Sequence, residues 1–150
     1  MLCDAMKRQF ANAFDMLEAA IPSFEARQWH SGRPPHRGPS LLTMHVLQCA
    51  EFYTSGDEGV WMSFGKPVWE ISDSEGPSQR QLLDYLADCR SKTMDWIDAI
   101  GDHALGSKCA NTEFSNNLEL MAYALRHLQH HLGEICACQK QCGLPAANWK

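Results

Sequence analysis

Apolar residues recur at the 3.6-residue spacing of a helix in four stretches of this chain, and this pattern constrains the fold most strongly. The spacing predicts helices over residues 3–29, 40–55, 78–100 and 116–141. The alternation typical of a strand occurs only in Pro67–Ile71. Helices without strands bury their apolar faces against one another, so the sequence predicts an all-α fold, a four-helix bundle with long crossing loops.

Capping residues and helix breakers set the expected boundaries of these helices. Ser40, Ser78 and Asn116 each precede an apolar periodic stretch and are the expected N-caps, because their side chains can accept from free backbone N–H groups. Pro22 lacks a backbone N–H and is expected to bend or interrupt the first helix.

Two segments are expected to be loops. Residues 30–39 contain three prolines and two glycines, which no regular element tolerates. The longer connection, residues 56–77, has no helical period and is expected to cross one end of the bundle. Its aromatic residues Trp61, Phe64 and Trp69 are expected to cover that end rather than to form a wall of a binding cavity.

Length, charge and cysteine content limit the class of protein. A chain of 150 residues can bury one core, so a single domain over 1–150 is expected. A net charge of −5 argues against nucleic acid as a partner. Charges at Asp4, Lys7 and Arg8 interrupt the apolar core that a signal peptide needs, so none is expected, and no apolar run is long enough to span a membrane. Seven cysteines, an odd number, favour free thiols and a cytoplasmic location.

Histidines form the strongest candidate for chemistry. His127 and His131 are four residues apart, so they lie about 40° apart on one helix face and can bind one ion. His45 lies among apolar residues of the predicted second helix and is the expected third ligand from another element. Imidazole suits zinc, nickel or iron. The alternative is structural: a solvated histidine pair, with His45 bonded to a carbonyl in the core.

Other residues near this pair have less certain roles. His130 is about 100° from His131, so either His127 with His131 or His127 with His130 can chelate one ion, but not all three. Glu134 lies on the same helix face as His127 and His131. It is expected to be a hydrogen-bond acceptor for a ligand imidazole, a base, or an ordinary surface charge. Cys138 lies about 10.5 Å further along the helix than His131 and is expected to pack.

The remaining histidines and cysteines are assigned no site. Three histidines lie in expected loops, where surface exposure is the usual state: His30, His36 and His103. The C-terminal cysteines lack a second cysteine pair at the spacing of a zinc ribbon: Cys136, Cys138 and Cys142.

The order of these features resembles the DinB superfamily, helical-bundle proteins that include bacterial thiol transferases. The resemblance covers the whole chain and rests on His45 in Leu-Thr-Met-His-Val-Leu and on the late motif His127-Leu-Gln-His-His131. Glu134 stands where the family often has glutamine. The resemblance implies a divalent metal ion held by His45, His127 and His131 beside an open cavity, and it selects His131 over His130.

Two functions are expected, and the resemblance bears on the first of them. The first is a metal-dependent thiol transferase or hydrolase, in which the ion lowers the pKa of a low-molecular-weight thiol or of water for attack on a small electrophile. The second is a non-catalytic metal-binding stress-response protein that acts as a homodimer. A ferritin-like di-iron centre ranks last, because the chain contains no Glu-x-x-His motif.

Overall fold

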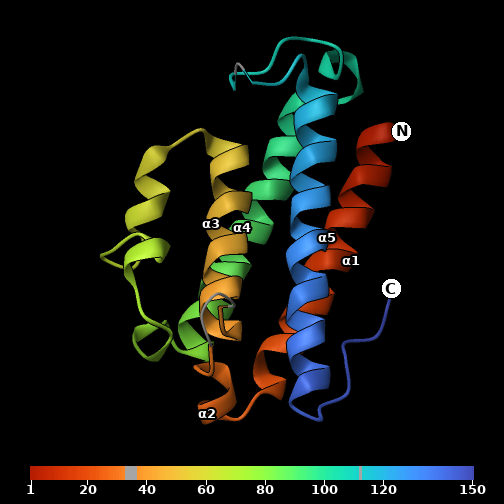
Figure 1. The fold of residues 1–150 in the computed structure, drawn as a ribbon. Coiled ribbons are helices and arrows are strands. Elements are labelled where there is room, and N and C mark those ends of the chain that lie inside the picture. Colours follow the sequence, from red (N-terminus) through yellow and green to blue (C-terminus); the bar gives the residue numbers. More distant parts are fainter. Residues whose placement is uncertain (33–36, 112) are drawn as a thin grey trace.

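The computed structural model describes residues 1–32, 37–111 and 113–150, and within these ranges the protein is all-helical with no strand (Figure 1). This confirms the predicted all-α class. The long helices are α1 (Leu2–Ala20), α3 (Pro39–Ser55), α4 (Gln79–Ile100) and α5 (Asn117–Gln141). The shorter elements are α2 (Ala26–Trp29) and the 3₁₀ helices η1 (Ile21–Ser23), η2 (Glu58–Met62), η3 (Val68–Glu70), η4 (Asp73–Glu75) and η5 (Asp102–Ala104).

Each long helix packs against two others. Helices α3 and α1 both contact α4 and α5, so the core lies between them. The expected apolar stripe of the first helix is buried throughout, with exposed fractions of 4% or less: Phe10, Phe14, Leu17, Ile21 and Phe24. Among the helices that the structure describes, none combines the length and the apolar character needed to cross a membrane.

The connection between α3 and α4 runs back along α3, with η2 and η3 in contact with that helix (Figure 1). The prediction that residues 56–77 cross one end of the bundle is therefore wrong. The reason is that α3 and α4 point in the same direction (Figure 1). The chain must travel the whole length of α3, about 25 Å, before α4 can begin.

The predicted interruption of the first helix is confirmed. Helix α1 ends at Ala20, η1 contains Pro22, and extended backbone at Phe24 separates η1 from α2. At the end of α2 the indole of Trp29 is buried, and its Nε1 donates to the carbonyl oxygen of Pro77, 2.9 Å away. This bond joins the start of the chain to the segment before α4.

The predicted cap of α4 is confirmed. Ser78 Oγ accepts from the backbone N–H of Gln81 at 3.3 Å, and Gln81 Oε1 accepts from the backbone N–H of Ser78 at 3.0 Å. The predicted cap of α5 is confirmed too, because Asn116 Oδ1 accepts from the backbone N–H of Glu119 at 2.9 Å.

The predicted cap at Ser40 is wrong. Helix α3 begins one residue earlier, at Pro39, and its N-cap is Gly38. Proline suits the first helical position because it has no N–H group to satisfy there. Ser40 lies inside the helix, fully buried, and its Oγ donates to the carbonyl oxygen of Pro77 at 2.7 Å.

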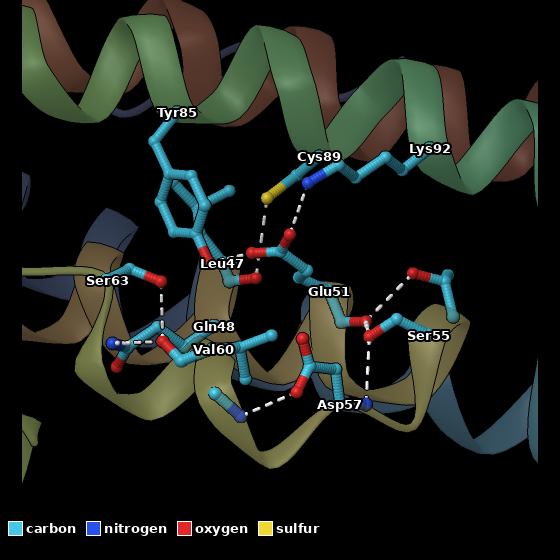
Figure 2. Close-up of polar contacts among 12 residues, drawn as sticks. Leu47, Gln48, Glu51, Ser55, Asp57, Val60, Ser63, Tyr85, Cys89 and Lys92 are labelled. Atoms are coloured by element: carbon cyan, nitrogen blue, oxygen red, sulfur yellow. Dashed lines mark hydrogen bonds and ion pairs between the residues drawn. The ribbon is translucent and has the colours of Figure 1, made fainter.

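Polar contacts hold α3 between α4 and the long connection (Figure 2). Glu51 of α3 accepts from the hydroxyl of Tyr85 at 2.5 Å and forms an ion pair with Lys92, both on α4. On the other side, Gln48 Nε2 donates to the carbonyl oxygen of Val60 at 3.0 Å. These contacts keep the helix that carries His45 in one orientation.

Candidate metal centre

The three histidines expected to bind metal come together where α3 packs against α5. The ring centroid of His45 lies 5.5 Å from that of His127 and 4.8 Å from that of His131. The centroids of His127 and His131 are 4.5 Å apart, since one helical turn separates the two residues. Packing of α3 on α5 therefore supplies the third imidazole that one helix alone could not place.

Burial keeps two of these imidazoles neutral at pH 7. Desolvation, with contributions from the nearby His131 and Arg37, lowers the pKa of His45 to about 4. Desolvation also lowers the pKa of His127 to about 4, again with a contribution from His131. Only neutral imidazole has a free lone pair for a metal ion, so these two imidazoles are in the protonation state that metal binding needs.

Glu134 contacts one of the three imidazoles directly. Its Oε2 lies 2.6 Å from Nδ1 of His131, one of the roles expected for this carboxylate. A carboxylate that accepts from one ring nitrogen orients the imidazole and leaves the other nitrogen available as a ligand. In this arrangement Nε2 of His131 is the nitrogen that is free to bind.

A cavity of about 900 Å³ opens beside the histidines. Its walls include His45, His131, Glu134 and Cys138, together with Trp69 from the long connection. Cys138 also packs against the core, as expected. The cavity gives a small molecule access to the imidazoles from one side.

The role expected for the aromatic residues of the long connection is wrong for Trp69. This indole forms part of the cavity wall, because the connection returns along α3 instead of closing one end of the molecule. Trp61 instead contacts the ring of Phe52 on α3, with centroids 5.2 Å apart. Phe64 contacts the ring of Tyr85 on α4 at 5.4 Å.

Cys49 is a candidate ligand that the sequence analysis did not identify. Its Sγ lies 3.7 Å from Nε2 and 3.8 Å from Nδ1 of His45. The sulfur and one ligand nitrogen each of His45 and His127 all lie within 4.8 Å of one another. Burial raises the pKa of the Cys49 thiol to about 12. The sequence contains a signal for this role, because Cys49 follows His45 by four residues, the same offset that places His127 and His131 on one helix face.

His130 lies at the edge of the cluster. Its ring is exposed and is 5.0 Å from that of His131, between centroids. With His131 and Glu134 it forms a second, more exposed group of possible ligands. It also lines a smaller hollow of about 240 Å³ with Tyr123 and His127, outside the larger cavity.

The histidines without an assigned role lie elsewhere. His103 is exposed on η5, and His30 is half-buried, with Nδ1 3.0 Å from the carbonyl oxygen of Asp73. His36 falls outside the residues that the structure describes. All seven cysteines are free thiols in this structure.

The low pKa values of His45 and His127 predict how the stability of the metal-free protein depends on pH. Between pH 6.5 and about 4 these imidazoles are protonated in the unfolded chain and neutral in the folded one, so unfolding takes up protons. The free energy of unfolding is therefore expected to fall as the pH drops through this range and to be insensitive to these groups above it. Both imidazoles are partly exposed to solvent, so the expected proton uptake on unfolding is somewhat below two.

Urea titrations of chelator-treated protein from pH 7.5 to 4.5 measure this dependence. The control is the double variant His45→Leu/His127→Leu, in which the proton uptake at about pH 5 should decrease by nearly two. An unchanged slope in the double variant would show that other groups cause the pH dependence.

In comparisons with known proteins, no family model and no curated protein sequence matches this chain.

Proposed function

We propose that this chain is a divalent-metal-binding protein of the DinB type, with α1, α3, α4 and α5 as a four-helix bundle. His45, His127 and His131 are the proposed ligands. The observation that carries this proposal is the meeting of three imidazoles from two helices, two of them at the wall of a cavity.

The spacing of the rings suits one ion. Imidazole nitrogens at about 2.1 Å from a tetrahedral ion place neighbouring ring centroids about 5 Å apart. The three observed separations, from 4.5 to 5.5 Å, bracket this value. Three imidazole ligands suit zinc, nickel or iron, and three protein ligands leave a coordination position for a small molecule.

The activity that this arrangement supports best is a metal-dependent thiol transfer or hydrolysis on a small electrophile. When bound, the ion lowers the pKa of a thiol or of water. Glu134 holds the ring of His131 in place, while Trp69 and Leu42 offer apolar wall area to a substrate in the cavity. Free cysteines are stable in a reducing compartment, so we place the protein in the cytoplasm, where low-molecular-weight thiols are available.

Elemental analysis of protein purified without a chelating column tests this proposal. Roughly one first-row metal ion per chain is expected. An ion that binds only the folded state stabilises it by about 2.7 kcal/mol at a hundredfold excess over Kd, so a chelator should lower Tm. A midpoint that stays the same after verified removal of the metal would contradict the proposal.

A second candidate is a non-catalytic metal-binding protein that acts as a homodimer. Cys49 favours it, because a fourth protein ligand fills the tetrahedral sphere of a structural zinc site. Addition of 2-mercaptoethanol to the cobalt(II)-substituted protein separates the candidates. A changed visible spectrum is expected for an ion that is accessible from the cavity, and an unchanged spectrum indicates a closed, non-catalytic site.

A further inference from the structure

The environment of Cys49 differs from that of the other buried thiols for which contacts are known. Cys49 is only 4% exposed. Among the described residues its sulfur has imidazole nitrogens as polar neighbours and no carbonyl acceptor. Cys89, on α4, is equally buried but donates to the carbonyl oxygen of Leu47. Cys49 is thus directed at the histidine cluster rather than at the backbone.

Cys49 is close enough to His45 for the two residues to share an ion. Metal–nitrogen and metal–sulfur bonds of about 2.05 and 2.3 Å at a tetrahedral angle separate the bound nitrogen from the sulfur by about 3.6 Å. Cys49 Sγ lies 3.7 and 3.8 Å from the two ring nitrogens of His45, so the imidazole must rotate to direct the lone pair of one nitrogen at an ion beside the sulfur. His127 lies close enough to complete a three-ligand group with these two residues.

We infer that Cys49 binds the metal ion as a thiolate, in addition to the three histidines. This inference rests on the proposed metal site. Formation of the sulfur–metal bond displaces the thiol proton, which leaves to solvent. Cys49 does not line the large cavity, whereas His45 and His131 do, so a small molecule reaches the ion from the cavity as a fifth ligand, a number that zinc can accommodate.

A thiolate ligand also restricts the metal. Imidazole with thiolate favours zinc and cobalt(II), whereas magnesium and manganese prefer oxygen ligands. The site is therefore expected to take up zinc and cobalt and to exclude magnesium and manganese at equal concentrations.

X-ray absorption spectroscopy of the zinc-loaded full chain, purified without added thiols, tests the inference directly. The expected result is one sulfur scatterer at about 2.3 Å together with nitrogen at about 2.0–2.1 Å. In Cys49→Ser the sulfur shell should disappear. Cys89→Ser is the matched control for a buried cysteine, and Cys138→Ser the control for a cysteine at the cavity; both should keep the sulfur shell.

The outcomes separate this inference from the proposed function. A wild-type spectrum with only nitrogen and oxygen scatterers overturns the role of Cys49 but leaves the three-histidine site intact. A sulfur shell lost in Cys138→Ser and kept in Cys49→Ser also overturns it. A protein that binds neither zinc nor any other first-row divalent metal overturns both proposals. If Cys49→Ser fails to fold, the wild-type spectrum still shows whether sulfur binds the ion, and the spectra of Cys89→Ser and Cys138→Ser show whether either of these cysteines supplies it.

Discussion

Replacement of His45, His127 or His131 by alanine is expected to reduce bound metal from about one ion per chain to nearly none. The change removes one of three imidazoles that lie within 5.5 Å of one another, between centroids. His130→Ala is the matched control, since this exposed side chain stands on the same helix but outside the large cavity. It should retain most of the metal.

Metal content per chain and Tm with and without chelator measure both effects together. The three depleted variants should have a Tm that no longer responds to the chelator, whereas the Tm of His130→Ala should still respond. If His130→Ala empties the site and His131→Ala does not, His130 rather than His131 binds the ion together with His127, and the assigned helix face is wrong.

Trp29→Ala is expected to lower the free energy of unfolding by about 3–5 kcal/mol. The indole is 1% exposed and packs against Phe24, with centroids 5.8 Å apart. Truncation leaves a large cavity and also removes the donor to the carbonyl oxygen of Pro77. The short helix α2 and the segment before α4 then lose their main contact.

Urea unfolding followed by circular dichroism measures this loss. Trp149→Ala is the control, because that side chain is 78% exposed and its removal should change the free energy of unfolding by less than about 0.5 kcal/mol. A loss below about 1 kcal/mol in Trp29→Ala would mean that the surrounding residues collapse into the space left by the indole.

The helices could be predicted from sequence because their signals are local. Apolar periodicity and a capping box act within a few residues, and they placed α4 within one residue of the expected start at 78. The interruption at Pro22 is local as well, since the missing N–H belongs to that residue. Ser40 failed as a cap because its hydroxyl found a partner far along the chain, at Pro77.

In the candidate site, too, the features within one helix could be predicted from sequence, and the features that depend on helix packing could not. The one-turn offset that stacks His127 above His131 is a property of one helix, and the contact between His131 and Glu134 is a property of the same helix. By contrast, the distance from His45 to either of them exists only because α3 packs on α5.

The sequence by itself thus determined the helical segments, two of their caps and which histidines share a helix face, because neighbouring residues carry that information. Tertiary structure alone decided that α3 and α4 point the same way, and this brought Trp69 to the cavity wall. It also decided that the sulfur of Cys49 is directed at imidazoles rather than at a carbonyl group. These features depend on how helices distant in sequence pack, and no local pattern records the direction of a helix or the neighbours of a buried side chain.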